Sequence, residues 1–220
     1  MEVNFILAVY TRQMDRTCEE NELIHDGVYG NRPGKRCHDP VLVDITQTEY
    51  SMITQTPLVK DNLDLSACFD RIMAHLSMIV SQAYGMPLVF TTFLGLLLHL
   101  AVYSIKTATG ITENAYTRKE NQWIDGPGQG LAYSGSGWGK TVSTLAQILE
   151  KHATMTPYCD PQALRNVYIF ISRFVDDNII NTPGTKCDDL ITLLERASVN
   201  ANLWNFIIFA TGGELNLSKC

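Results

Sequence analysis

The chain has 220 residues, of which 45% are hydrophobic and 18% are charged. This composition is typical of a globular protein with a core and excludes a largely disordered chain. The formal net charge of -6 counts against nucleic-acid binding by this chain alone, because surfaces that bind phosphate are usually basic.

Six cysteines are spread along the chain without a CxxC pair, so the spacing of a zinc site is absent. We expect reduced thiols and an intracellular protein, in the cytoplasm or the nucleus. The N-terminal stretch MEVNFILAVYTRQMDR lacks the leading positive charge and the long apolar core of a signal peptide.

The first part of the sequence predicts helices on either side of a short strand. Apolar residues recur at helical spacing over 5–20, and a turn-rich basic segment, YGNRPGKRCHDP (29–40), follows. The Asp-Pro pair at its end is typical of a helix start, and Pro57 ends that helix. The stretch PLVKDNLDL begins there and is expected to form a strand, and 66–84 again show helical periodicity.

One apolar segment raises the alternative of a membrane protein. MPLVFTTFLGLLLHLAVYSI (86–105) is long enough to span a bilayer, which takes about 20 apolar residues. Pro87, Gly95 and His99 interrupt it, and no cluster of Lys or Arg flanks it on one side. A buried helix followed by a core strand explains the segment as well, so we favour a protein without a membrane span.

The second half of the chain combines helices with a hairpin. A polar, turn-rich region over 106–128 precedes an amphipathic helix over 138–150. The β-branched and aromatic run VYIFISRF (167–174) predicts a strand, and NIINT (178–182) can return as a second strand. The two aspartates between them would then lie at the turn of the hairpin.

A long helix is expected from about 186 to 210. Thr185 and Asp188 resemble a capping box at its start, and Gly212-Gly213 would end it. Strands separated by helices, together with a hairpin, predict an α+β domain.

The stretch GSGWGKT (135–141) resembles the end of a phosphate-binding P-loop. That motif needs a glycine, four residues and then Gly-Lys followed by Ser or Thr, and Ser134 stands where the first glycine is required. No buried strand precedes it either. We therefore expect a helix start with Ser134 or Ser136 as cap, Trp138 buried and Lys140 solvated, and keep a P-loop-like ATPase as a less favoured alternative.

Carboxylates gather in two places that an antiparallel sheet can bring together. DLSACFD (64–70) has Asp64 at a strand end, and FVDD (174–177) has two aspartates at the hairpin turn. Clustered carboxylates repel one another unless a cation neutralises them, and oxygen ligands favour Mg²⁺ or Mn²⁺. Two such ions suit phosphoryl transfer. The alternative is that these aspartates are turn residues or helix caps.

The motifs DLSACFDRI, GPGQG, FVDD and GGELNLSKC occur in the order and approximate spacing of the palm motifs of reverse transcriptases. The sequence resembles most closely the retroelement enzymes of the non-LTR and group II intron type, over about residues 28–220. The resemblance implies an α+β polymerase palm, an antiparallel sheet backed by helices, with part of the fingers. It also implies an RNA-directed DNA polymerase that uses an RNA template, a DNA primer, dNTPs and two Mg²⁺ or Mn²⁺ ions, and no membrane.

The resemblance also divides the chain. Residues 1–60 are expected to be a partial fingers or upstream helical segment, and 61–220 the palm, with the thumb absent and the missing fingers and thumb regions present in the full-length protein. Two departures stand out, namely Ser134-Gly135 in place of a Ser-Pro pair and Phe174 in place of tyrosine. An inactive retroelement remnant that at most binds nucleic acid is the main alternative.

The site residues follow from the matched motifs. The resemblance implies that Asp64 and Asp176 are metal ligands, helped by the Leu65 carbonyl, and that Asp177 has a less direct role. It implies that Lys219 neutralises or protonates the leaving pyrophosphate, although a solvated terminal lysine is the alternative.

The resemblance also implies contacts with substrates. Phe69 matches a steric gate that excludes the 2′-hydroxyl of a ribonucleotide, with core packing as the alternative. Gln129 and Gly130 match a pair near the incoming nucleotide. The basic residues Arg32, Lys35 and Arg36 are candidates for template phosphate, or form a plain solvated loop.

Overall fold

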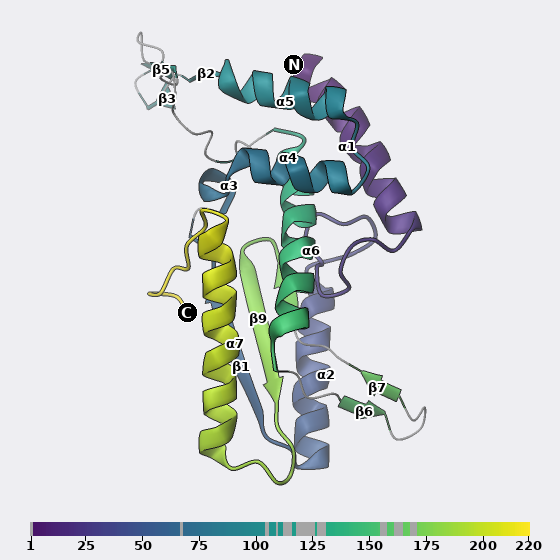
Figure 1. Ribbon diagram of the computed structural model, residues 1–220, viewed down its shortest axis with the longest axis vertical. Helices are drawn as coiled ribbons and strands as arrows, with labels where there is room; N and C mark the ends of the chain where they lie inside the picture. The colour runs from purple at the N-terminus through teal and green to yellow at the C-terminus, as the bar shows by residue number, and fades with distance from the viewer. Residues whose placement is uncertain are drawn as a thin grey trace.

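A three-stranded antiparallel sheet organises the lower half of the molecule (Figure 1). It consists of β1 (Leu58–Asp64), β9 (Asp177–Pro183) and β8 (Ile171–Phe174), in the order β1-β9-β8. The computed structural model describes residues 2–66, 68–103, 106–108, 110–111, 116–117, 126, 131–154, 158–160, 165–167 and 171–220. The predicted strand from Pro57 and the predicted return strand over 178–182 are thus confirmed, and they pair with each other.

Helices make up most of the remaining described chain. They are α1 (Glu2–Glu20), α2 (His38–Thr54), α3 (Cys68–Arg71), α4 (Ala74–Ala83), α5 (Leu88–His99), α6 (Ser134–His152) and α7 (Leu190–Ala210). Three short strand pairs lie outside the central sheet: β2 (Val102–Tyr103) with β5 (Tyr116–Thr117), β3 (Lys106–Thr107) with β4 (Gly110–Ile111), and β6 (Tyr158–Asp160) with β7 (Arg165–Val167). The chain is therefore an α+β protein.

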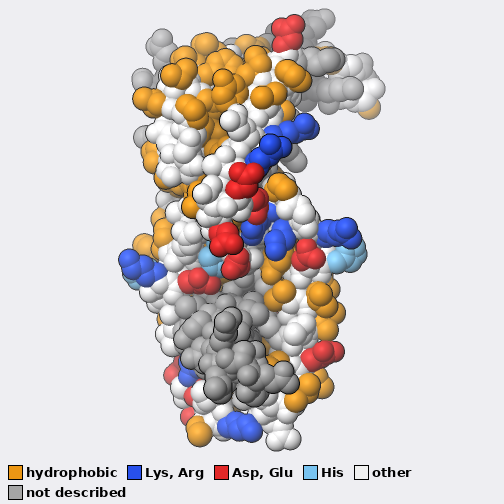
Figure 2. Space-filling model, turned by 90° about the vertical axis from the view of Figure 1, so that its right-hand side faces the viewer, with side chains coloured by type: hydrophobic (Ala, Val, Ile, Leu, Met, Phe, Trp, Pro, Cys, Tyr) orange, Lys and Arg blue, Asp and Glu red, His pale blue; other side chains and the backbone are white. Residues whose placement is uncertain are grey.

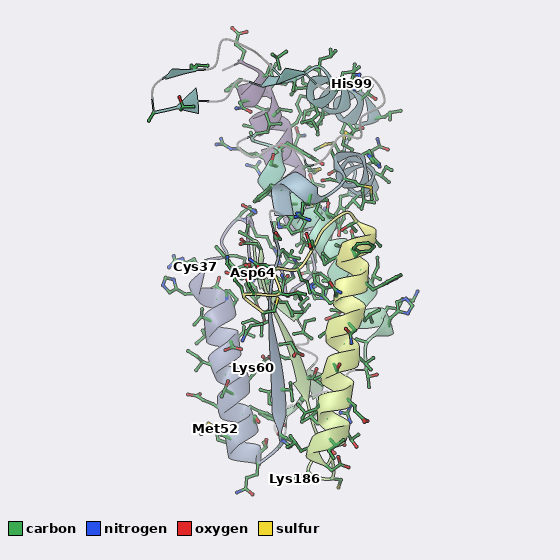
Figure 3. The ribbon with its side chains drawn as sticks, turned by 90° about the vertical axis from the view of Figure 1, so that its left-hand side faces the viewer. Cys37, Met52, Lys60, Asp64, His99 and Lys186 are labelled. Carbon is green, nitrogen blue, oxygen red and sulfur yellow. The ribbon has the colours of Figure 1, made fainter. Side chains whose placement is uncertain are left out.

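The sheet lies between helices on both faces. α7 packs on β1 and β9 and also touches α6, while α2 packs against β8. Figure 3 shows α2 and α7 on opposite sides of the sheet. The expectation of an antiparallel sheet backed by helices thus agrees with the structure, in which helices cover both faces. α1, α4 and α5 form the other end of the molecule (Figure 1), where Tyr10 and Phe90 stack with ring centroids 4.8 Å apart.

The helix predicted over 66–84 is broken in the middle. α3 ends at Arg71 and α4 begins at Ala74, with Met73 between them at φ -56° and ψ 116°, outside the helical range. The backbone there pairs with distant segments instead of continuing the helix. The Met73 N–H donates to the Thr211 carbonyl at 3.1 Å, and the Ile72 carbonyl accepts from Gly126 N at 2.8 Å. Local periodicity cannot reveal such partners.

The ends of α7 differ from the predicted ones. Its N-cap is Asp189, whose side chain accepts from Thr192 N at 2.8 Å, so the helix begins later than the predicted 186. Thr185 and Asp188 instead form a turn before it, with Thr185 N donating to Asp188 Oδ2 at 2.8 Å. The predicted C-terminal signal is confirmed, because Gly212 has φ +86° and follows the last helical turn.

The stretch GSGWGKT is helical and lies inside α6. The predicted serine caps are wrong, because α6 begins without a side-chain cap and the Ser136 hydroxyl bonds to Asp15 Oδ1 at 2.5 Å. Trp138 is buried as predicted. Lys140 was expected in solvent, yet its side chain is 2% exposed and its ammonium lies 2.5 Å from Asp15 Oδ1. A buried helix with its lysine paired to a carboxylate does not form a phosphate loop.

Within the apolar segment 86–105 the structure describes the short helix α5 and then β2, where Val102 is 61% exposed, so no core strand begins there. α5 buries Phe90, Thr91, Leu94 and Leu98. None of the helices within the described ranges has the length and apolar character needed to cross a membrane.

Candidate functional site

Two aspartates face each other at the end of the central sheet. Asp64 is the last residue of β1 and Asp177 the first of β9, and the antiparallel register pairs them directly. Residues paired across two strands point to the same face of a sheet, so both side chains lie on the face that α2 covers. Asp176 lies in the turn between β8 and β9, where its carbonyl accepts from Leu65 N at 3.3 Å. The structure thus brings the predicted carboxylates together.

The C-terminal segment adds a lysine to this pair. Leu65 forms a β-bridge with Leu215, Ser66 N donates to the Glu214 carbonyl, and Asn216 N donates to the Asp64 carbonyl, both at 2.8 Å. These bonds place Lys219 Nζ 3.3 Å from Asp64 Oδ2. Asp64 is only 13% exposed whereas Lys219 is 66% exposed, so the lysine reaches in from solvent.

The turn between the strands is held by the side chain of Asn178. Its buried amide donates to the Asp176 carbonyl at 2.7 Å and to the Leu63 carbonyl at 3.0 Å. One side chain therefore ties the hairpin turn to the end of β1. Sequence reasoning did not select Asn178, although an amide directly after two aspartates at a turn is a recognisable signal.

The segment before α2 also supports the hairpin. Val28 forms a parallel bridge with Arg173, and Tyr29 N donates to the Arg173 carbonyl at 3.0 Å. Gly30 approaches the turn so closely that an added Cβ would lie 2.6 Å from Val175 N. A side chain at position 30 would therefore displace the turn that carries Asp176.

A cavity of about 420 Å³ opens beside the aspartates, between the start of α2 and the sheet. Figure 3 labels Asp64 at this end of the sheet, level with Cys37 at the start of α2. The lining includes residues of the site, of β8 and of α2: Asp64, Asp177, Lys219, Phe174, Pro40 and Asp44. The site is therefore a partly open cleft with carboxylates on one wall.

The site carries an excess of negative charge. The pKa of Asp177 is raised, first by burial and then by the neighbouring charges of Asp176 and Asp64, while Lys219 acts in the opposite direction. Among the described residues, no three His, Cys, Asp or Glu side chains gather closely enough to form a metal cage. Clustered carboxylates are nevertheless a donor set that suits a hard divalent cation, and the Lys219 ammonium already contacts Asp64.

This charge predicts a pH-dependent effect of Asp177→Asn. The folded-state pKa of Asp177 lies above the unfolded value, so its ionised form costs stability at pH above the folded pKa, and this cost disappears below the unfolded pKa. In EDTA at pH 7 the variant should melt about 1–2 °C higher than the wild type, a small gain because the site is partly solvated. Thermal scans from pH 7 to pH 4 should show the gain shrinking, and added Mg²⁺ should remove it at pH 7.

Phe69 lies in α3, half-buried, with its ring centroid 6.2 Å from that of Trp138 in α6. It packs against the hydrophobic core, and its role as a steric gate remains a prediction. Gln129 and Gly130, the predicted pair near the nucleotide, lie outside the described residues.

The basic residues of the 29–40 segment do not join the carboxylate site. Arg32 makes two 2.7 Å hydrogen bonds to Glu19 and donates to the His25 and Val28 carbonyls, and its side chain is 10% exposed. Its donors thus fix the segment on α1, and a phosphate contact remains a prediction. On the face that carries α1, acidic and basic side chains stand side by side at mid-height (Figure 2).

Lys35 and Arg36 are closer to the solvent. Lys35 Nζ lies 5.7 Å from the centre of the Tyr29 ring, and Arg36 is exposed with its backbone N–H bonded to Asp39. Contacts of both side chains with a template also remain predictions.

The sequence pattern did not single out Arg173, which lies on β8 of the hairpin. Its side chain is buried, with the guanidinium 4.6 Å from the Trp204 ring of α7 and 5.8 Å from the Trp138 ring of α6. A charged residue inside an otherwise apolar strand was the available signal.

No protein-family model matches the sequence, and no curated protein matches it. Solved structures do share its fold. The apo telomerase of Candida tropicalis, truncated from the C-terminal domain, has a TM-score of 0.59 at 12% identity over 99% of this chain. The telomerase of Candida albicans, in complex with a TWJ fragment of telomeric RNA, has a TM-score of 0.52 at 16% identity over the same share.

The chain therefore shares its fold with a part of each of these telomerases. It spans 40% of the length of the first of these proteins and 34% of the second.

Proposed function

We propose that this chain is the palm and part of the fingers of an RNA-directed DNA polymerase. The observation that carries the proposal is the meeting of three motif segments at one sheet end: Asp64 from β1, Asp176 and Asp177 from the hairpin, and Lys219 from the C-terminal segment. The telomerase-like fold supports it independently of the motifs. In this proposal residues 61–220 form the palm and 1–60 belong to the fingers.

The proposed reaction is attack of a primer 3′-hydroxyl on the α-phosphate of a dNTP. Asp64, Asp176 and the Leu65 carbonyl would hold two Mg²⁺ ions, with Asp177 adjacent. The bound ions would stabilise the negative charge on the attacking and leaving oxygens. The residues of the chain supply the positioning, which is a large part of catalysis in phosphoryl transfer.

Two side chains have further roles in this proposal. Phe69 would press on the sugar of the incoming nucleotide and exclude a 2′-hydroxyl. Lys219 would leave Asp64 when substrate binds and neutralise the leaving pyrophosphate. Its long, exposed side chain allows that movement.

The class of enzyme to which this polymerase would belong is part of the proposal as well. The motifs favour a retroelement enzyme of the non-LTR or group II intron type. The structural similarity is to telomerases, and identities of 12% and 16% bear on the fold alone.

The proposal is tested by primer extension with the purified protein, an RNA template and labelled DNA primer. Mg²⁺-dependent addition of dNTPs is expected, with rNTPs used poorly and addition abolished by EDTA. A folded protein that adds no nucleotide to any RNA or DNA template would instead support the inactive remnant.

A further inference from the structure

Trp138 connects two parts of the proposed site that come from distant segments of the chain. It lies early in α6 and its side chain is 2% exposed. Its indole N–H donates to the Val175 carbonyl at 2.9 Å, in the turn just before Asp176. The same ring lies against Phe69, with centroids 6.2 Å apart and planes tilted by 57°.

The turn that receives this hydrogen bond is strained. Val175 has φ +58°, a left-handed conformation that is unfavourable for a β-branched residue. Such a conformation persists only when its surroundings enforce it. The Val175 carbonyl is held by Trp138 and the next carbonyl, that of Asp176, by Asn178 and by Leu65 N. These bonds fix the peptide units on both sides of the Asp176 α-carbon.

We propose that Trp138 is a positioning residue with two separable actions. Its indole N–H fixes the turn that carries Asp176 and Asp177, and its ring supports Phe69 so that the gate rejects ribonucleotides. This inference rests on the proposed polymerase function and adds to it a residue that determines both rate and sugar selectivity.

The two actions can be separated by substitution. Trp138→Phe keeps an aromatic ring beside Phe69 and removes the N–H donor. Trp138→Leu removes both. Trp204→Phe is a matched control, because Trp204 is equally buried and also packs on Arg173, but its indole nitrogen has no hydrogen-bond partner among the described residues.

Two measurements distinguish positioning from a general loss of stability. The first is the single-turnover rate of dNTP and rNTP addition on an RNA template. The second is Mn²⁺ binding, followed by electron paramagnetic resonance without nucleotide, which reports the carboxylates independently of turnover. Circular dichroism melting establishes that each variant is folded at the assay temperature.

Trp138→Phe should lower the dNTP rate about tenfold, with weaker Mn²⁺ binding and an unchanged dNTP-to-rNTP ratio. Trp138→Leu should lower the rate at least as much and also reduce the dNTP-to-rNTP ratio severalfold. Trp204→Phe should behave as the wild type in both measurements. If Trp138→Phe retains wild-type rate and Mn²⁺ affinity, or if Trp204→Phe loses as much, the positioning role is overturned.

Separate results test the support of Phe69 by Trp138 and the proposed polymerase function. An unchanged sugar ratio in Trp138→Leu overturns the support of Phe69 and leaves the action on the turn. A folded wild type that adds no nucleotide overturns the proposed function. In that case weaker Mn²⁺ binding by Trp138→Phe than by Trp204→Phe would still support the action on the turn, and equal binding would overturn it.

Discussion

Asp64→Asn is expected to lower the rate of dNTP addition by about a thousandfold or more, because it removes a charge that the proposed reaction centre requires. Asp64 is 13% exposed, lies opposite Asp177 and contacts Lys219. The measurement is single-turnover primer extension on an RNA template with saturating Mg²⁺. Circular dichroism should show the same fold for variant and wild type, because asparagine preserves the shape of the side chain.

Asp61→Asn is the matched control for this prediction. Asp61 lies on the same strand, but three positions earlier and hence on the opposite face of the sheet. Burial raises the pKa of its carboxyl, so the neutral amide is easier to bury than the carboxylate. We expect wild-type activity and unchanged or higher stability for this variant. Equal losses in the two variants would show that the strand, rather than the carboxylate of Asp64, is what activity needs.

Asp15→Ala is expected to reduce the free energy of unfolding by about 3 kcal/mol, because it leaves a buried ammonium without its counter-charge. Lys140 is 2% exposed, and its Nζ contacts Asp15 Oδ1 at 2.5 Å and the Ser136 hydroxyl at 2.6 Å. The pair joins α1 to α6 and is the most deeply buried charge contact described between two helices. Urea unfolding followed by circular dichroism measures the loss.

The double variant Asp15→Ala, Lys140→Met supplies the control for the ion pair. An apolar side chain of similar length removes the unpaired charge, so the double variant should be more stable than Asp15→Ala alone. A cost below about 1 kcal/mol for Asp15→Ala would contradict the structural role assigned to the pair.

Much of the site was predictable because its segments carry strong local patterns. The alternating and β-branched runs around Asp64 and FVDD predicted two strands with carboxylates at their ends, and the register pairs Asp64 with Asp177. The resemblance implied a role for Lys219 at this site, with a solvated lysine as the alternative, and its ammonium lies 3.3 Å from Asp64 Oδ2. The metal, substrate and template roles of these residues remain predictions.

What could not be predicted depends on contacts between distant residues. Nothing in the sequence near Lys140 indicates that its ammonium would pair, inside the protein, with Asp15, 125 positions away. Arg32 sits in a basic loop that suggested phosphate contacts, but Glu19 on α1 holds its guanidinium. The helical pattern over 66–84 continues through Ile72 and Met73, where backbone partners from elsewhere interrupt the helix. In each case tertiary pairing outweighed the local preference.

The most direct test of the central claim compares Asp176→Asn with the wild type in Mg²⁺-dependent addition of a single dNTP to a primer on an RNA template. The proposed two-metal site predicts incorporation by the wild type and essentially none by the folded variant. Equal incorporation by both proteins would contradict the assignment of Asp176 and, with it, the proposed catalytic centre.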